Sequence, residues 1–333
     1  MIIAGIDEAG YGPLLGPLVV SACAMEAPGE MPVEWEAVPC LWRLLKAAVA
    51  KKHAGAKGRL VIADSKVIHN LTDGDRLLER GVLAFLAALG AADGAALPGS
   101  LQELLVRLGC TSHELEAHPW YALQNTALPW LCDSGDLAIA GNVLAAAMNR
   151  SGVKMCALRT AVLSERLFNR LVGGTNNKAS ALVSVTLGHL YFLHQAYGQR
   201  GLVVAIDKQG GRDHYTTLLL RTFPEATLKV LQESAESSSY LLTEPADGDT
   251  VRRTLILFRE KSETHFLATA LASMTCKYLR ELCMSGFNAW WCEKVAGLRP
   301  TAGYHQDGTR WLMDVEPHLP RLGVTREMLV RCR

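Results

Sequence analysis

Acidic residues follow two of the most apolar segments of this chain, and their placement is suited to metal chemistry. Asp7 and Glu8 come directly after the apolar run 2–6, and Asp207 comes directly after the apolar run 202–206. Short, wholly apolar runs bounded by turn residues are typical of buried strands. In an open sheet, ligands commonly bind beyond the carboxyl ends of the strands. If these two strands are parallel neighbours, their acids meet at one site.

A further acid ends an apolar stripe on the strongly helical segment 264–284. The stripe has a helical period of ~100° per residue and consists of Leu267, Leu271, Met274, Tyr278 and Glu281. Glu281 is therefore expected to face the core, where an unpaired carboxylate is costly, so it must meet a cation. Lys277 or Arg280 is the simplest partner. A metal ion shared with the acids at the strand ends is the alternative, and the spacing leaves both open.

The candidate acids suit a hard divalent cation. Oxygen ligands favour Mg²⁺ or Mn²⁺, and no histidine or cysteine stands at ligand spacing beside these acids to favour zinc. Two such ions about 3.5–4 Å apart can activate a water and stabilise the leaving oxygen in phosphodiester hydrolysis. If these acids share a site, a pair of Mg²⁺ or Mn²⁺ ions would suit it as cofactor, with Asp7, Glu8, Asp207 and Glu281 as the candidate ligands.

A glycine-rich turn follows the first two acids and contains Gly10, Gly12 and Gly16. Asp7 and Glu8 alternate across a strand, so they can share a site only if the chain twists or bulges at Glu8. The turn has three interpretations: a polar turn with solvated acids, a dinucleotide phosphate loop, or a metal-dependent phosphodiester site. In the second, the third glycine comes one residue late for the G-x-G-x-x-G pattern, and the acids would repel a phosphate.

The bulk composition limits the class of protein. The chain has 333 residues, 49% of them hydrophobic, and a net charge of +1, so it has no global basic field that would bind nucleic acid non-specifically. Any such binding needs a local patch, and the basic cluster Lys51, Lys52, Lys57 and Arg59 is interpreted as a solvated face. Nine cysteines without a C-x-x-C pair indicate a reducing cytoplasm rather than a disulfide framework. Neither a signal peptide nor a membrane span is expected, and a monomer is expected.

Periodicity predicts an α/β protein in which helices cover a central mixed sheet. The expected helices are 41–51, 73–89, 137–149, 176–197, 213–223 and 264–284. The expected strands are two within 1–25 and others over 154–163, 202–206, 227–231, 240–243 and 251–258, the last two joined through the turn 245–248. Residues 1–284 are expected to form a catalytic domain with a helical insertion at about 90–135. Residues 285–333 are expected to be a helical extension packed on it.

Several blocks of the chain resemble the type 2 ribonucleases H, that is, ribonucleases HII and HIII. The first is Asp7-Glu8-Ala9-Gly10-x-Gly12-Pro13-Leu14-x-Gly16-Pro17-Leu18-Val19-Val20. Others follow in the family's order: Asp64-Ser65-Lys66, Ile206-Asp207, Lys261-Ser262-Glu263, Ala270-Leu271-Ala272-Ser273-Met274, Lys277, Arg280-Glu281 and, more weakly, Gly303-Tyr304. The resemblance implies a ribonuclease H-like fold. It also implies metal-dependent endonucleolytic cleavage of the RNA strand of an RNA–DNA hybrid.

The resemblance also implies roles for individual residues. Asp7, Glu8, Asp207 and Glu281 would be the catalytic metal ligands, with nucleic acid as the partner. The substrate-binding residues would be Gly10, Tyr11, Gly12, Ser65, Lys66, Lys261 and Tyr304. A phosphate track could add Lys208, Arg212 and Lys277, whereas His214 and His265 are left out of the catalytic set.

Two positions depart from the family's pattern. Tyr11 stands where the family has Arg or Lys, in a loop that helps to read the ribose 2′-hydroxyl. Glu281 stands where the family has Asp, and misplacement of a catalytic group by about 1 Å can cost about 100-fold in rate. Two alternatives therefore stay open. One is a relative that binds nucleic acid without cutting it, and the other is a nuclease of the same fold with another substrate.

Overall fold

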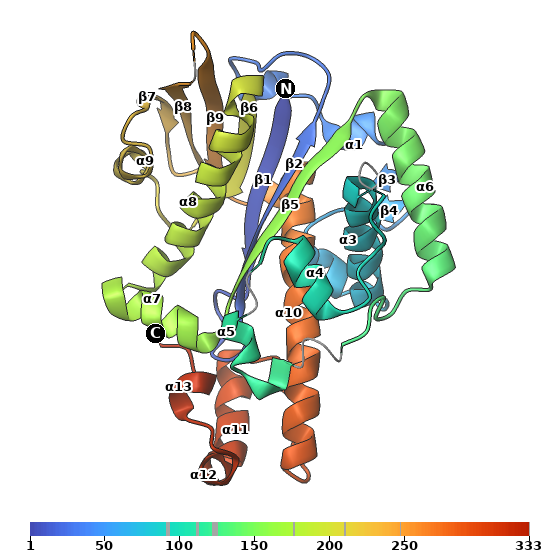
Figure 1. Cartoon of the computed structure of the whole chain (residues 1–333), viewed down its shortest axis with the longest axis vertical. Helices are drawn as coiled ribbons and strands as arrows, with labels where there is room; N and C mark the ends of the chain where they lie inside the picture. The colour runs from blue at the N-terminus through green and yellow to red at the C-terminus, as the bar shows by residue number, and fades with distance from the viewer. Residues whose placement is uncertain are drawn as a thin grey trace.

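The computed structural model describes residues 1–90, 94–110, 113–121, 126–175, 177–209, 211–246 and 248–332. Across these residues the chain builds a seven-stranded sheet in the order β5-β2-β1-β6-β9-β8-β7 (Figure 1). The strands are β1 (Ile2–Ala9), β2 (Leu18–Glu26), β5 (Lys154–Leu163), β6 (Leu202–Asp207), β7 (Thr227–Glu233), β8 (Ser237–Pro245) and β9 (Val251–Arg259). Strands β1, β6 and β9 are parallel to one another, and the other neighbours are antiparallel. A separate parallel pair joins β3 (Val49–Ala50) to β4 (Leu60–Val61).

Helices lie on both faces of this sheet and, in the C-terminal segment, beyond one end of it (Figure 1). They are α1 (Leu41–Leu44), α2 (Ser65–His69), α3 (Gly74–Gly90), α4 (Leu101–Arg107), α5 (His113–Glu116), α6 (Ser134–Ser151), α7 (Glu165–Thr175), α8 (Lys178–Tyr197), α9 (Thr216–Thr222), α10 (Leu267–Lys294), α11 (His305–Val315), α12 (Leu319–Leu322) and α13 (Arg326–Leu329). In Figure 1, α8 crosses one face, and α10 lies on the other with α3 beside it. The expected fold class, an α/β protein with a central mixed sheet flanked by helices, is confirmed.

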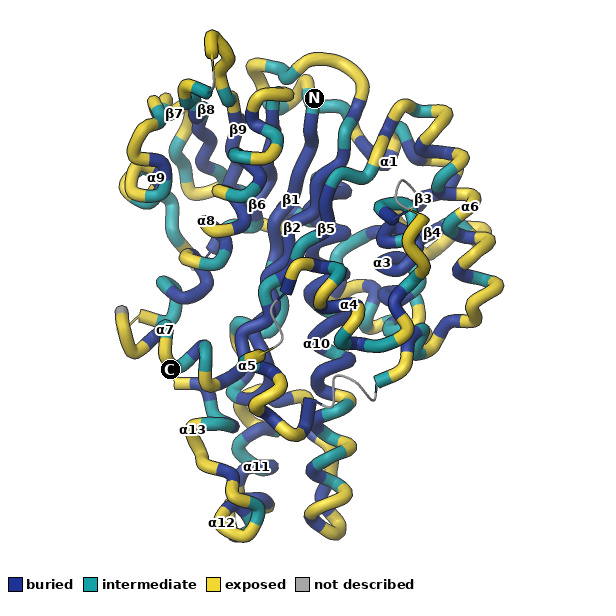
Figure 2. Tube along the Cα trace, in the orientation of Figure 1, coloured by how far each residue is buried: buried dark blue, intermediate teal, exposed yellow. Residues whose placement is uncertain are grey.

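Strand β1 divides the core into two layers, because successive side chains point to opposite faces. Ile2, Ala4 and Ile6 join the core beneath α8, whereas Ile3 joins the core beneath α10. Gly5 is on the α10 face, and a Cβ there would lie 2.1 Å from the backbone nitrogen of Thr269. Only glycine permits this close approach of a helix to a strand. The tube in Figure 2 is dark blue along β1, β2 and β6, as expected for strands buried on both faces.

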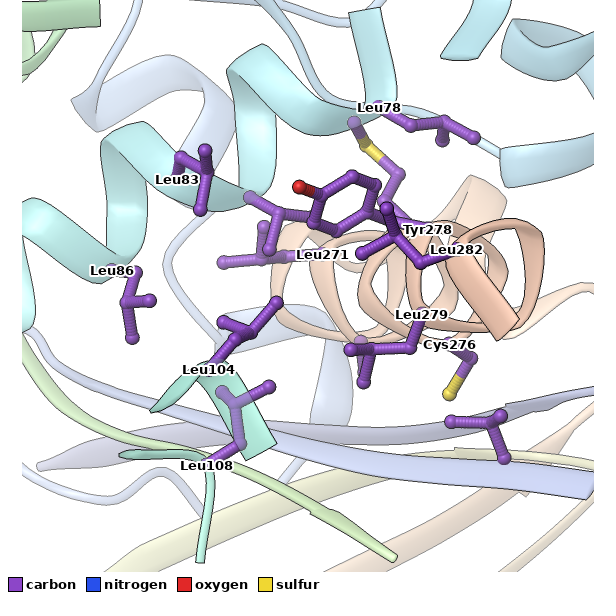
Figure 3. Packing of buried hydrophobic residues seen from close by; sticks show 14 of the residues in the cluster. Leu78, Leu83, Leu86, Leu104, Leu108, Leu271, Cys276, Tyr278, Leu279 and Leu282 are labelled. Atoms are coloured by element: carbon purple, nitrogen blue, oxygen red, sulfur yellow. The ribbon is translucent and has the colours of Figure 1, made fainter. Parts of the chain in front are cut away.

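The core beneath α10 also joins α3 and α4. In Figure 3, leucine side chains of these three helices meet around the ring of Tyr278. The labelled residues of this cluster are Leu78, Leu83, Leu86, Leu104, Leu108, Leu271, Cys276, Tyr278, Leu279 and Leu282. The described part of the expected insertion is therefore packed on the α3–α10 pair.

A buried carboxylate fastens the end of that insertion. Glu79 of α3 is fully buried. It accepts hydrogen bonds from the backbone N–H groups of Trp130 (2.5 Å), Leu131 (2.6 Å) and Cys132 (2.6 Å), and from the hydroxyl of Tyr278 (2.7 Å). A buried charge is tolerated where donors surround it. Glu79 thus ties α3, α10 and segment 130–132 together.

Several expected boundaries are wrong. The helix expected over 41–51 ends at Leu44, because residues 49–50 pair with 60–61 as β3 and β4. The helix expected over 264–284 begins at Leu267 and continues to Lys294, so it crosses the expected domain boundary at 284 without a break. The division into domains stays a prediction. Helix α7 was not predicted.

The β8–β9 hairpin is confirmed, with Pro245 opposite Val251, and Asp247 of its turn lies outside the described residues. Within the described part of the expected insertion, α4, α5 and a 3-10 turn at Pro119–Tyr121 are the helical pieces. Of the helices described, none is both long enough and apolar enough to cross a membrane.

Replacing Glu79 tests the role of its hydrogen bonds. In Glu79→Gln, one end of the side chain becomes an NH₂ group that faces N–H donors, so hydrogen bonds are lost and a donor is left buried without an acceptor. We expect the free energy of unfolding to fall by about 2–4 kcal/mol. Urea titration followed by circular dichroism measures it, with the exposed Glu225→Gln as control. Equal midpoints for the two variants would contradict the assignment.

A buried histidine gives the fold an acid-sensitive contact. Nε2 of His189 in α8 donates to the carbonyl oxygen of Val20 in β2 (3.1 Å), and burial lowers the pKa of His189 to about 4. Imidazole in an unfolded chain has a pKa of about 6.5. Between these values the unfolded state binds a proton that the folded state does not, so the free energy of unfolding falls as pH falls through this window.

Between pH 7 and pH 4, we expect the free energy of unfolding of the wild type to fall by about 2–3 kcal/mol more than that of His189→Gln, which keeps an N–H donor. Urea titrations at a series of pH values measure the difference. Parallel pH profiles for the two proteins would refute this role of His189.

Candidate metal-binding active site

The acids at the strand ends lie at one rim of the sheet. Strands β1 and β6 are parallel neighbours, and their pairing ends at Ile6 opposite Ile206, so the acids that follow project past the last shared pair. They border a cavity of about 340 Å³. Its lining is Asp7, Glu8, Ala9, Gly10, Tyr11, Gly12, Pro13, Asp64, Ser65, Lys66, Asp207, Glu263, Ser273, Lys277, Arg280 and Tyr304. The structure thus brings Asp7, Glu8 and Asp207 together.

Of the twist or bulge expected at Glu8, the bulge is not present. Strand β1 pairs with β2 in unbroken register through Asp7, Glu8 and Ala9. Both acids reach one cavity because β6, the neighbour on the other side, ends at the same level. The side chains of Asp7 and Glu8 point to opposite faces of the sheet, but both can reach a cavity at its rim, so a bulge in the strand is not needed.

Besides Asp64, the cavity is lined by one more carboxylate that the sequence did not predict as a site residue, Glu263. It follows β9, the third parallel strand, whose Arg259 stands opposite Asp207. The turn that carries Glu263 is fixed to the site because the N–H of Ser262 donates to Oδ1 of Asp207 (3.1 Å). A signal was present, since the apolar run 255–258 is followed by two acids, Glu260 and Glu263. The intervening residues hid the pattern.

Burial and mutual repulsion govern the charges of this acidic cluster, defined as Asp7, Glu8, Asp207 and Glu263. Burial, followed by the charges of Glu8 and Asp207, raises the pKa of Asp7 well above its usual range. Burial, followed by the charge of Asp207, raises the pKa of Glu8 to about 7 and that of Glu263 to about 7. Burial also raises the pKa of Asp207, although hydrogen bonds from backbone N–H groups oppose the rise. Without a counter-charge these acids resist being ionised together.

The donor set of the cluster fits a divalent cation. Oε2 of Glu8 and Oε2 of Glu263 are buried and accept no hydrogen bond within the described residues. Buried carboxylate oxygens without partners are costly unless a cation or donor meets them. Carboxylates alone, with no imidazole or thiolate among them, are the ligands that Mg²⁺ and Mn²⁺ prefer.

Glu281 does not join the acidic cluster. Its Oε1 lies 2.5 Å from Nζ of Lys277, one helical turn back, so the structure gives it the simpler of its two expected partners. Glu281 borders a second cavity of about 550 Å³, and Lys66, Lys277, Arg280 and Tyr304 line both cavities. The two cavities are therefore adjacent, and the role of Glu281 as a metal ligand stays a prediction.

Glu281 has two other possible co-ligands, of which His69 also lines the second cavity. One ligand atom from each of His69, Asp75 and Glu281 lies within 4.8 Å of the others. Nδ1 of His69 is 2.7 Å from Oδ1 of Asp75. Within the described residues, His69, Asp75 and Glu281 are the group whose ligand atoms all lie within 4.8 Å of one another. The ligand atoms of the acidic cluster lie further apart. Three cations line the same second cavity and oppose the binding of another one.

Arg280 holds the glycine turn beside the acidic cluster. Nη1 of this buried arginine donates to the carbonyl oxygen of Pro17 (2.7 Å), and Nη2 donates to those of Leu15 (3.1 Å) and Ala302 (3.2 Å). Gly16 has a φ of +81°, and a Cβ there would lie 2.8 Å from Nη1 of Arg280. The glycine turn therefore needs glycine both for its backbone conformation and for the space that the guanidinium fills.

Segments distant in sequence complete this clamp on the glycine turn. The N–H of Gly16 donates to Oε1 of Glu165 (2.9 Å), a buried carboxylate whose Oε2 accepts from the hydroxyl of Tyr121 (2.7 Å). The backbone N–H of Arg331 donates to the carbonyl oxygen of Leu14 (3.0 Å), and its guanidinium donates to that of Pro13. The turn is thus fixed from several sides, including the C-terminal segment.

Most of the other predicted substrate-binding residues line the first cavity. Oγ of Ser65 lies 2.9 Å from Oγ of Ser273, and Lys66 is exposed at the rim. The ring of Tyr11 has Nζ of Lys178 at 4.7 Å from its centroid. Tyr304 is 53% exposed, so its ring is available to a ligand. Gly10 and Gly12 line the cavity with them.

The structure does not bring the remaining candidates to the cavity. Lys261, Lys208 and Arg212 are absent from its lining. Nζ of Lys208 is 2.5 Å from Oδ1 of Asp213, and the Lys208 side chain is only 3% exposed. His214 pairs with Glu233 (2.8 Å), away from the cavity.

Comparisons with known proteins find similar solved structures. No family model matches the chain, and no curated protein matches it. One similar chain is from the PCNA:RNase HII complex of Archaeoglobus fulgidus. It is 14% identical, with a TM-score of 0.44 and coverage of 100% of this chain and 95% of the other. Ribonuclease H2 from Pyrococcus horikoshii OT3 is 12% identical, with a TM-score of 0.42 and coverage of 99% and 92%. RNase H3 from Aquifex aeolicus is 14% identical, with a TM-score of 0.40 and coverage of 99% and 71%.

Metal titration of three variants tests the acidic cluster. We expect Asp7→Asn and Glu263→Gln to weaken Mn²⁺ binding at least about 10-fold, because each removes an anionic oxygen from a set of oxygen ligands. Glu281→Gln should weaken it less than about 3-fold, because Lys277 already neutralises Glu281. Isothermal titration calorimetry at pH 8 measures all three. Loss of binding in Glu281→Gln with normal binding in Glu263→Gln would reverse the assignment.

Proposed function

We propose that this chain is a metal-dependent endonuclease resembling type 2 ribonuclease H, and that it hydrolyses the RNA strand of RNA–DNA hybrids. One observation carries the proposal. Three parallel strands deliver four carboxylates to one cavity, beside a glycine turn that buried charged groups clamp in place. Such carboxylate sites suit phosphodiester hydrolysis, and the blocks that resemble the family supply all four acids.

The acidic cluster would hold the cations. Asp7, Glu8, Asp207 and Glu263 line the cavity, as does Asp64, whose side chain caps α2, and Glu281 borders the adjoining cavity. When bound, Mg²⁺ or Mn²⁺ would activate a water and stabilise the leaving oxygen of the cleaved phosphodiester. The chain itself contributes the placement of these oxygens and the exclusion of bulk water from them.

Cations at the rim would bind the substrate backbone. Lys66 and Lys277 line the same cavity as the acids, so they can meet the non-bridging oxygens of a phosphate that enters it. Lys66 is held in position because its N–H donates to Oδ1 of Asp64 (2.8 Å), which caps α2. Positive charge here also offsets the repulsion between a phosphate and the acidic cluster.

The glycine turn would contact the sugar. A Cβ at Gly12 would meet no atom within 4 Å, so this part of the turn is open to a ligand. The hydroxyl of Tyr11 can donate a hydrogen bond to the ribose 2′-hydroxyl, the group that distinguishes RNA from DNA. Tyr304 lies at the same rim and can stack on a sugar or base.

Cleavage of labelled duplexes tests the proposal. We expect cutting of an RNA–DNA hybrid with Mg²⁺ or Mn²⁺ and none with EDTA. Asp207→Asn should lower kcat at least about 10³-fold, since a misplaced catalytic ion loses several kcal/mol of transition-state stabilisation. Plain DNA and DNA with one embedded ribonucleotide complete the panel.

The other outcomes identify the alternatives. Cutting of plain DNA as fast as the hybrid would show a nuclease of another specificity. Tight binding of the hybrid by folded protein without cutting, in either metal, would show a protein that binds nucleic acid without cleaving it.

A further inference from the structure

One stretch of the chain has a strong local positive charge. Residues 38–66 contain seven basic side chains and a single acid, Asp64. The basic residues are Arg43, Lys46, Lys51, Lys52, Lys57, Arg59 and Lys66. The whole chain has a net charge of only +1, so positive charge is concentrated here. We call residues 41–61 of this stretch, from α1 to β4, the basic lobe.

The fold fixes the basic lobe beside the candidate active site. Helix α1 packs on α10, and β4 packs on α3. Nε1 of Trp42 donates to the carbonyl oxygen of Ile62 (2.9 Å), and Nζ of Lys51 lies 4.8 Å from the centroid of the Trp42 ring. Strand β4 then leads within a few residues to Ser65 and Lys66, which line the cavity of the acids. Figure 1 shows β3 and β4 next to α3, on the flank of the molecule.

Most cations of the basic lobe are available to a ligand. Arg43, Lys46, Lys51, Lys52 and Lys57 are exposed. None of these five takes part in an ion pair within the described residues. Arg59 is different, because its guanidinium donates to three backbone carbonyl oxygens and so braces the loop. The lobe therefore presents cationic side chains without ion-pair partners on a loop that Arg59 holds in place.

A groove lies between the basic lobe and α3. Its volume is about 720 Å³, and its basic lining residues are His53, Lys57, Arg59, Arg76 and Arg80. The turn after α2 borders the groove with Leu71, Thr72 and Asp73, while α2 itself borders the second cavity with Lys66 and His69. A continuous surface thus runs from the candidate active site over α2 to the groove.

We infer that the basic lobe binds the phosphate backbone of a nucleic-acid duplex that extends beyond the cleavage site, an inference that rests on the proposed function. Lysine ammonium groups bind phosphates as point charges without reading sequence. The exposed side chains of residues 41–61 are lysines, Arg43, His53 and small residues, with no exposed Phe, Tyr or Trp among them, so the lobe contacts the backbone rather than stacking on bases. The basic lobe thus provides local positive charge, although the chain as a whole has a net charge of only +1.

Two matched triple variants test the basic lobe. The lobe variant is Lys46→Glu, Lys52→Glu and Lys57→Glu, all exposed side chains outside the candidate active site. The control is Arg221→Glu, Lys229→Glu and Arg253→Glu, three exposed cations on α9, β7 and β9 at the other end of the sheet. Both change the net charge equally. Circular dichroism establishes that both are folded.

The probes are RNA–DNA hybrids of roughly 8 and 24 base pairs and a plain DNA duplex of the longer length, with binding measured in EDTA over a series of salt concentrations. We expect the lobe variant to bind both longer duplexes about 10- to 100-fold more weakly than wild type at low salt. The slope of log K against log salt should fall by about 2–3, since each lost phosphate contact removes about 0.9. The short hybrid and the control variant should change less than about 3-fold.

Cleavage of the short hybrid in Mg²⁺ tests the proposed function separately. If no variant cuts it but the lobe variant alone loses binding of long duplexes, the inference about the lobe stands without the nuclease. Equal losses in both triple variants, an unchanged salt slope, or no duplex binding by the wild type would overturn it. Competition by poly-glutamate as effective as that by DNA would overturn it in favour of an acidic protein partner.

Discussion

Contact between α10 and β1 at Gly5 determines where the groups of the candidate site lie. Because Gly5 has no side chain, the backbone of the helix reaches the strand directly beside Thr269. The following turns of α10 then pass the strand end, so Sγ of Cys276 lies 3.2 Å from the carbonyl oxygen of Asp7 and Ser273 hydrogen-bonds its side chain. Arg280, further along the helix, reaches the glycine turn. One helix thus positions the acids, their hydrogen-bond donor and the turn beside them.

This arrangement places several carboxylates close together in a buried site, where ionising all of them is unfavourable. Burial raises the pKa of every carboxylate in the acidic cluster, and repulsion adds to the rise for Asp7, Glu8 and Glu263. Each raised pKa corresponds to a cost of ionising the group in the folded protein. The clamp on the glycine turn offsets that cost through hydrogen bonds from Arg280 and Arg331 and to Glu165. Glu165 and Arg331, which are absent from the lining of the cavity, therefore stabilise the site without touching a ligand.

The parts of this structure that depend on local pattern were predictable from the sequence. Apolar runs ending in acids indicated β1 and β6, and the stripe on α10 indicated the face that carries Glu281. Other features depend on contacts between segments that are distant in the sequence. Val49 and Ala50 continue a helical pattern but pair with β4 instead, and Glu263 is brought to the cavity only because β9 lies beside β6. The partner of Glu281 could be narrowed to a cation from the sequence, and the ion pair with Lys277 is evident only from the structure.

The central claim is that the acidic cluster at the rim of β1, β6 and β9 is the metal-binding site. Anomalous diffraction from crystals soaked in Mn²⁺ tests it most directly, because the ion is located independently of any activity. The account predicts anomalous peaks among Asp7, Glu8, Asp207 and Glu263. Peaks confined to the His69–Asp75–Glu281 group, with none in the acidic cluster at saturating Mn²⁺, would contradict it.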